Sequence, residues 1–238
     1  MSNVHRNRRV IAVLVIAIVP AFLLIQQLFA QPTIKTDDSV KNNVIQNDSS
    51  ENLAMSELEK LIVKDRAPKT GYKRNEFGNG WIKWSKCDTR QKILARDLTD
   101  IVLDDDGCTV LSGILNDPYT GNIIEFVRGT GTSNAVQIDH VVALSNAWQT
   151  GAQNLDLETR ISLANDDLEL LAVEGKANQQ KSDCDAADWL PPNVAFRCQY
   201  VARQIAVKIK YALWVTQNEY DAIKRVLTTC PEQRLPSP

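Results

Sequence analysis

The chain is poor in histidine, with only His5 and His140 in 238 residues. It also carries no excess of positive charge: the formal net charge is −2, and residues 1–30 contribute three arginines and no acidic residue, which leaves −5 for the rest. This charge excludes a basic footprint spread over the whole surface, so any footprint for nucleic acid must be local. The best candidate is the stretch that holds Arg197, Arg203, Lys208 and Lys210. We find no internal repeat, which excludes a repeat protein.

The long uncharged apolar run of the chain, Val10 to Ile25, follows three arginines at its N-terminal side. A basic stretch before an apolar one is typical of an export signal, so residues 1–30 are predicted to be a signal peptide or an N-terminal membrane anchor. Ala30 suits a cleavage site, Leu28 does not, and residues 10–30 could span a bilayer, so both outcomes stay open. In either case we expect the rest of the chain to be secreted or anchored to the outer face of the cytoplasmic membrane.

The remainder divides by composition into a short polar stretch and one domain. Residues 31–50 are rich in Asn, Asp, Ser and Gln and are predicted to be a tether, because they contain too few apolar residues to build a core. Residues 51–238 are long enough for one domain with its own core.

Five cysteines follow the leader, and an oxidising compartment would favour pairing four of them, which the sequence alone allows in several ways. Cys198 would open one predicted helix and Cys230 would close the next, so an antiparallel helix pair would bring them together. Of the others, Cys87 and Cys108 are then the expected second pair, with Cys184 unpaired.

The apolar patterns predict an α+β domain with a β-hairpin and a C-terminal helical pair. Helices are expected over 51–64, 89–100, 142–150, 157–163, from 176, over 193–215 and from 217; strands are expected over 81–84, 108–115, 123–128, 136–140 and 168–173. Asp88, Asn193 and Thr216 are expected to cap the helices that follow them.

His140 directly follows Asp139 at the end of the predicted strand 136–140. A lone histidine is more often structural than catalytic, and Asp139 could simply cap a following helix. Neighbouring side chains of a strand point to opposite sides, however, so an Asp-His pair can act together only where the strand ends.

Several segments together resemble the HNH endonucleases, and more closely the secreted branch of the DUF1524 family, whose proteins are related to the C-terminal part of GmrSD. The resemblance covers about residues 81–230 and is carried by five motifs: Cys87-Asp88-Thr89-Arg90-Gln91, Asp117-Pro118-Tyr119-Thr120-Gly121, Gln137 to Leu144, Asp167 to Lys181, and Asp188-Trp189-Leu190-Pro191-Pro192. It implies an HNH-like ββα-metal core in which a strand pair and a helix hold one divalent ion.

Carried over residue by residue, the resemblance gives Asp139 and Asn178 as metal ligands and His140 as the base that activates water. Lys181, one helical turn beyond Asn178, would contact a phosphate and belong to the catalytic set. The residue before the second strand is usually Asn in the family, whereas this chain has Asp167 there and Asn165 two positions earlier, so either could support His140.

Phosphodiester hydrolysis suits these residue types. Histidine can take a proton near neutral pH, and hard oxygen ligands favour Mg²⁺ or Mn²⁺ as the cofactor. Arg90 is expected either to bind substrate or to form a salt bridge. The five tryptophans are interpreted as core residues rather than base-stacking platforms.

The sequence therefore predicts an exported, metal-dependent nuclease of low sequence specificity, acting on DNA more than on RNA. Two alternatives remain: an exported binding domain with the HNH fold but no catalysis, and a hydrolase of cell-envelope phosphodiesters that uses the same residues.

Overall fold

The computed structural model describes residues 53–236, which lie within one of the two compact units of the chain, residues 50–238. The predicted leader at 1–30 and the tether at 31–50 fall outside the described residues. Within 53–236, no helix has both the length and the apolar character needed to cross a bilayer.

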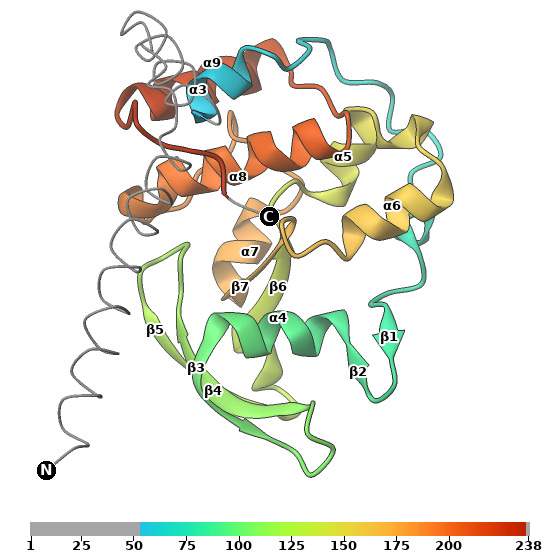
Figure 1. Ribbon diagram of the computed structural model, residues 1–238, viewed down its shortest axis with the longest axis vertical. Coiled ribbons are helices and arrows are strands. Elements are labelled where there is room, and N and C mark those ends of the chain that lie inside the picture. Colours follow the sequence, from blue (N-terminus) through green and yellow to red (C-terminus); the bar gives the residue numbers. More distant parts are fainter. Residues whose placement is uncertain (1–52, 237–238) are drawn as a thin grey trace, which may run out of the picture. The chain divides into compact units, whose positions relative to one another are not determined.

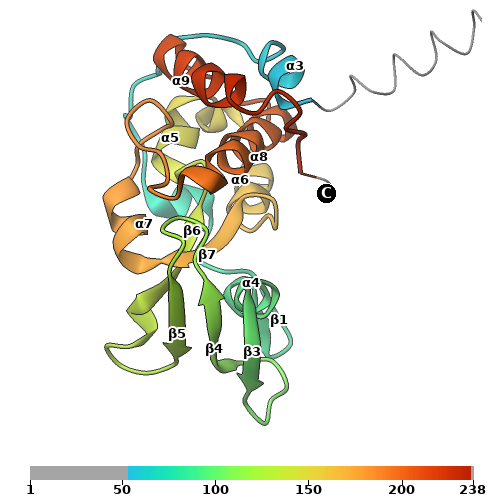
Figure 2. The same cartoon turned by 90° about the vertical axis from the view of Figure 1, so that its left-hand side faces the viewer.

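The fold mixes α-helices with three small antiparallel sheets (Figures 1 and 2). The helices are α3 (Ala54–Leu58), α4 (Thr89–Asp97), α5 (Leu144–Gln149), α6 (Leu157–Ala164), α7 (Gly175–Lys181), α8 (Arg197–Lys210) and α9 (Gln217–Thr228). The strands are β1 (Lys83–Trp84), β2 (Cys87–Asp88), β3 (Leu98–Leu103), β4 (Val110–Asn116), β5 (Ile123–Val127), β6 (Val136–His140) and β7 (Leu170–Glu174). Four 3₁₀ turns complete the set: η1 (Arg74–Phe77), η2 (Ser133–Ala135), η3 (Ala152–Asn154) and η4 (Val194–Phe196).

The strand pair β6–β7 lies in the middle of the domain and is followed directly by α7. Its antiparallel register sets Asp139 opposite Leu171 and His140 opposite Leu170. Figure 2 shows the pair between the helices α5, α8 and α9 on one side and the sheet β3–β4–β5 with α4 on the other. A buried two-stranded ribbon therefore carries the Asp-His pair.

This ribbon separates two apolar cores. Leu171 and Val173 of β7 belong to the larger, helical core, whereas Leu170 and Ala172 belong to the core under α4 and the three-stranded sheet. Alternate residues of a strand point to opposite faces, so both faces of β7 are covered by apolar side chains. The ribbon is thus fixed from both sides, which holds the end of β6 in place.

The predicted hairpin is present as β4 and β5, but the structure adds β3 at its other edge. The expected helix 89–100 ends at Asp97, and Leu98–Leu103 pairs with β4 instead. The start of this helix, α4, was predicted correctly, since Asp88 accepts a hydrogen bond from the Gln91 amide. Tertiary pairing overrides helix propensity here, because Leu98, Ile101 and Val102 suit a half-buried strand.

At the N-terminus of the described region, the predicted helix 51–64 is much shorter. Only Ala54–Leu58 is helical, a turn follows over 59–61, and Val63 then bridges to Val215 beyond α8. Asn193 is also not the expected helix cap: its side-chain amide donates to the Pro118 carbonyl, and η4 precedes α8.

The C-terminal helical pair forms from α8 and α9, as predicted, although the expected helix 193–215 is helical from Arg197 only to Lys210. Thr216 caps α9 through the Glu219 amide. The Cys198–Cys230 disulfide joins α8 to the end of α9, and a second disulfide links Cys87 to Cys108. Both bridges are those expected from the sequence, and Cys184 is unpaired.

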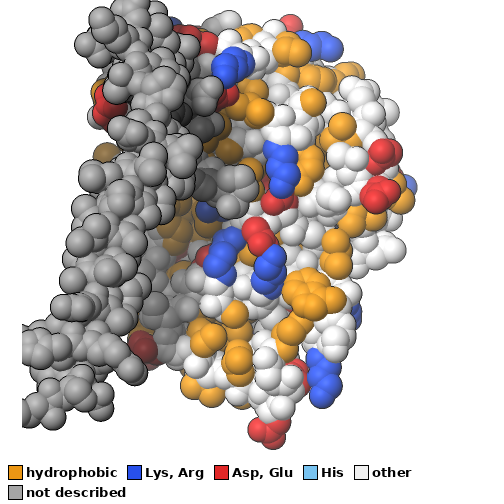
Figure 3. Space-filling model, in the orientation of Figure 1, with side chains coloured by type: hydrophobic (Ala, Val, Ile, Leu, Met, Phe, Trp, Pro, Cys, Tyr) orange, Lys and Arg blue, Asp and Glu red, His pale blue; other side chains and the backbone are white. Residues whose placement is uncertain are grey.

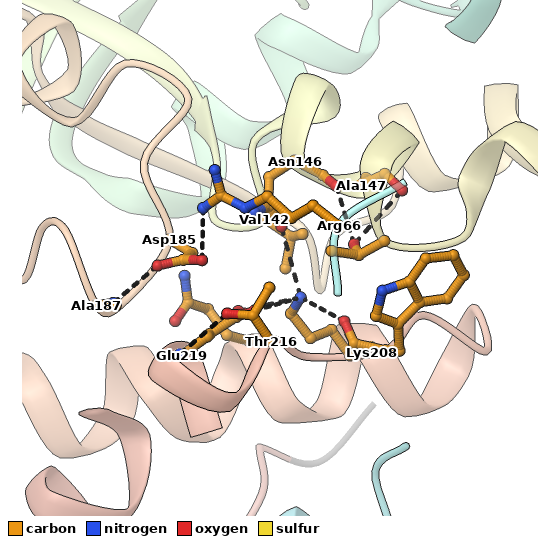
Figure 4. Close-up of polar contacts among 12 residues, drawn as sticks. Arg66, Val142, Asn146, Ala147, Asp185, Ala187, Lys208, Thr216 and Glu219 are labelled. Carbon is orange, nitrogen blue, oxygen red and sulfur yellow. Dashed lines mark hydrogen bonds and ion pairs between the residues drawn. The ribbon is translucent and has the colours of Figure 1, made fainter. Parts of the chain in front are cut away.

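A charged pair is enclosed between these two helices (Figure 4). Lys208 is fully buried and lies 3.0 Å from the Glu219 carboxylate, while its ammonium also donates to the Trp214 carbonyl. Burial raises the pKa of Glu219, an effect that the Lys208 charge partly offsets. The pair fixes the packing of α8 against α9 through polar contacts inside the core.

Candidate functional site

His140 lies at the end of β6 and is almost completely buried. Its Nε2 is 3.0 Å from the carbonyl oxygen of Ala164, the last residue of α6. The imidazole also stacks on Trp81, with ring centroids 5.6 Å apart and 11° between the planes. Both contacts restrict the orientation of the ring.

These contacts determine which nitrogen of His140 can accept a proton. A carbonyl oxygen only accepts hydrogen bonds, so Nε2 carries the hydrogen and Nδ1 carries the lone pair. Burial, reinforced by the nearby Arg74 charge, lowers the pKa of His140 to about 3. The imidazole is therefore neutral over the physiological pH range, with its lone pair at Nδ1.

Asp139 precedes His140 and points to the opposite side of the strand. Its carboxylate accepts hydrogen bonds from the Tyr119 hydroxyl and from the Lys181 ammonium, the latter at 3.0 Å. Burial raises the pKa of Asp139, while Lys181 and Tyr119 act in the other direction. The carboxylate is thus held by a tyrosine from the β4–β5 turn and a lysine from α7.

Helix α7 supplies two of the predicted residues. Lys181 is fully buried, and its ammonium donates to Asp139 and to the His140 carbonyl at 2.7 Å. Asn178 lies in the helix interior rather than at its start, and its side-chain amide donates to Gln137 Oε1. Gln137 and Asp139 share one face of β6, so α7 covers that face with Asn178 and Lys181 side by side.

A cavity of about 390 Å³ brings three of the predicted residues together. Its lining includes Asp139, His140 and Asn178, and also two basic side chains, Lys69 and Arg74. Lys69 pairs with Asp183 at 2.9 Å. Within residues 53–236, no hydrogen bond or ion pair engages the Arg74 guanidinium, so this exposed cation remains available to an anion in the cavity.

Of the two residues considered for support of His140, only Asn165 lies in the local framework of the imidazole. Its side-chain oxygen accepts from the Thr89 hydroxyl at 2.7 Å and from the Ile82 amide at 2.9 Å. It therefore fixes the chain next to Trp81, and its neighbour Ala164 holds the imidazole. Asp167 pairs with Lys92 instead, at the surface.

The other basic residues singled out in the sequence lie elsewhere. Arg90 donates to the Val136 carbonyl, at the opposite end of β6 from His140, and burial lowers its pKa. Of the four basic residues proposed as a local footprint on and near α8, Lys208 is buried, Lys210 pairs with Asp166, and Arg197 and Arg203 donate to backbone carbonyls. On the face shown in Figure 3, basic, acidic and apolar side chains are interspersed.

Sequence reasoning missed Tyr119, Trp81 and Arg74 as members of the site. Tyr119 stands within a motif that carries the family resemblance, and its position between Asp117 and Gly121 made it look like a turn residue. The structure shows a second purpose for that turn: Asp117 accepts from the Glu174 amide just before α7, at 2.9 Å. For Arg74 the sequence offers no signal beyond its charge.

Among the described residues, no group of three or more His, Cys, Asp or Glu side chains is arranged to hold a metal ion. The oxygen donors that line the polar cavity near His140 include the predicted ligands Asp139 and Asn178, together with Asp183, Ser145 and Ser182. Such hard donors suit Mg²⁺ or Mn²⁺, with water or phosphate completing the shell.

The amino-acid sequence is similar to a known family and to a secreted fungal protein. Residues 88–226, more than half of the chain, match the family described as GmrSD restriction endonucleases, C-terminal domain. A protein from Arthroderma benhamiae, named "Uncharacterized secreted protein", is 39% identical over 187 residues, which cover 77% of this chain and 88% of the relative. No solved structure matches the chain. The chain therefore belongs to the family of GmrSD restriction endonuclease C-terminal domains, which is related to nucleases.

Proposed function

We propose that this protein is an exported, metal-dependent nuclease that hydrolyses phosphodiester bonds of nucleic acid with low sequence specificity, DNA more than RNA. The observation that carries the proposal is the shared cavity of Asp139, His140 and Asn178 beside the unpaired Arg74 guanidinium. Family membership supports the same reaction class. The secreted relative and the two disulfides support export.

The strand pair β6–β7 followed by α7 has the order of elements expected for an HNH-like ββα core. Asp139 and Asn178 would hold the divalent ion, Mg²⁺ or Mn²⁺, from β6 and α7 respectively. When bound, such an ion offsets the negative charge that gathers on the phosphate and on the departing oxygen.

The protein residues account for the rest of the reaction. His140 takes the proton of the attacking water at Nδ1, because its Nε2 hydrogen is engaged by Ala164. Arg74 lies beside His140 and would hold a phosphate oxygen through its guanidinium. Asn165 and Trp81 keep the imidazole in place. In the structure Lys181 balances the Asp139 charge, so its contribution is to position that carboxylate rather than to bind phosphate directly.

A plasmid-nicking assay with Mg²⁺ or Mn²⁺ tests this proposal. His140→Ala should lower the cleavage rate by about 100- to 10,000-fold, because the general base is lost. Arg90→Ala is a suitable control, since it changes a basic residue at the other end of β6. A wild-type protein that is as inactive as His140→Ala on DNA and on RNA would contradict the proposal.

One observation favours the alternative of a non-catalytic binding domain with the same fold. The Lys181 ammonium already neutralises Asp139, which reduces the attraction of the carboxylate for a divalent ion. Titration with Mn²⁺, monitored by calorimetry, separates the two functions. A nuclease should bind Mn²⁺ and lose this binding in Asp139→Asn. A binding domain should show no Mn²⁺ binding in either form.

A further inference from the structure

A second cavity, of about 340 Å³, lies on another side of His140. Its volume is at the lower end of the range of small-molecule sites. Apart from Arg74, His140 and two asparagines, its walls are apolar, aromatic or glycine backbone: Phe77, Gly78, Gly80, Trp81, Leu144 and Ala164. It therefore differs in chemistry from the polar cavity that contains Asp139 and Asn178.

The two cavities are neighbours, because Arg74, His140 and Leu144 line both of them. An anion held by Arg74 in the polar cavity would thus lie next to the entrance of the apolar one. The candidate base, His140, forms part of the boundary between the two cavities. A ligand that has an anionic group and a flat apolar group joined by a short link would fill both cavities at once.

The aromatic wall of the second cavity is firmly placed. Trp81 is half-buried and stacks on the His140 imidazole, and the next residue is anchored by a hydrogen bond from its amide to Asn165. The loop before it turns through Gly78 and Gly80, with φ of +94° and +104°. A Cβ atom at Gly78 would lie only 3.0 Å from Ile161, so the loop packs closely beside the cavity.

We propose that this second cavity binds an unstacked nucleobase of the nucleotide next to the scissile phosphate, with Trp81 as its stacking surface. The inference rests on the proposed function and narrows its substrate. A base can enter such a cavity only after it leaves the helical stack, so single-stranded or locally unpaired nucleic acid is the preferred substrate over intact duplex.

The decisive experiment compares two single-stranded oligonucleotides, each with one cleavable phosphodiester among methylphosphonate linkages. One has normal bases on both sides of that linkage, and the other is abasic there. Loss of one stacked base should lower kcat/KM of the wild type by about 5- to 150-fold. Trp81→Ala should cleave both oligonucleotides at equal rates, whereas Trp81→Phe should keep part of the preference.

Trp84→Ala is the matched control, because Trp84 is an exposed tryptophan three residues further along that lines neither cavity described above. It should discriminate like the wild type. The ratio of the two rates is the readout, so a general loss of activity through the Trp81–His140 contact does not affect the conclusion. Equal cleavage of the two oligonucleotides by the wild type would overturn the base-binding inference while leaving the nuclease function intact.

Calorimetry gives a test that does not depend on cleavage. A deoxynucleoside monophosphate should bind more tightly than deoxyribose 5-phosphate, and Trp81→Ala should abolish the difference. If the protein cleaves nothing but shows this difference, the nuclease proposal fails and the base-binding cavity stands. If the two compounds bind equally, the cavity does not recognise a base.

Discussion

Two lysines, Lys181 and Lys208, are fully buried, and each ammonium lies 3.0 Å from a buried carboxylate oxygen. Lys208 and Glu219 are enclosed between helices α8 and α9, where the remaining contacts of the ammonium are to Trp214 and Asn146. Lys181 and Asp139 instead border a cavity beside His140.

The comparison shows that the same local chemistry serves two purposes. A buried ion pair contributes little net stability over an apolar pair, because desolvation offsets the attraction. The Lys208–Glu219 pair therefore acts mainly in fixing how two helices pack. In the other pair, Lys181 holds the Asp139 carboxylate at the edge of the polar cavity, where a substrate can enter.

The largest effect is expected from breaking the enclosed pair. Lys208→Ala leaves Glu219 buried without its cation and should lower the free energy of unfolding by about 3–5 kcal/mol, measured by urea denaturation. Activity per folded molecule should not change. The double variant Lys208→Met/Glu219→Leu should recover most of the stability, since it removes both charges. A loss below about 1 kcal/mol, the range of exposed pairs, would show that the pair is not isolated from water.

The same kind of substitution can be made in both ion pairs. Asp139→Asn and Glu219→Gln each replace a carboxylate by an amide of similar shape beside a buried lysine. Asp139→Asn should lower the rate of plasmid cleavage by about 100-fold or more, because the charged oxygen ligand is lost. Glu219→Gln should leave the rate unchanged. Similar losses in both variants would mean that activity reports the stability of the fold and not the cavity.

The smallest effect concerns pH and the enclosed pair alone. Burial raises the pKa of Glu219 above its value in the unfolded chain, so its contribution to stability is fully present below pH 4.5 and is lost as the pH rises through the raised pKa. The stability of the wild type relative to Glu219→Gln should fall by about 1 kcal/mol per pH unit within this window. Melting curves from pH 4 to 8 check this. An increase instead would mean that the Lys208 charge outweighs burial.

Much of the local structure follows from short-range patterns in the sequence. The caps at Asp88 and Thr216, the β4–β5 hairpin and the strand 136–140 were predicted because each depends on neighbouring residues. The Cys198–Cys230 disulfide was predicted from the positions of two helix ends, and Cys87–Cys108 was the pair that then remained. The strand β3 was not, since its pairing with β4 comes from contacts that a local pattern does not show.

Sequence patterns alone were enough to select the Asp139-His140 pair and the helix with Asn178 and Lys181 as candidate site residues, and to suggest the family to which the chain belongs. Which groups contact this pair depends on the tertiary structure. Tyr119 reaches Asp139 from a turn about twenty residues away, and Ala164 and Trp81 orient His140 from two further segments. In the folded chain Lys181 pairs with Asp139 in the interior, because a buried carboxylate without a cation would cost several kcal/mol. Such contacts depend on how the two cores pack around one strand pair, which no spacing along the chain records.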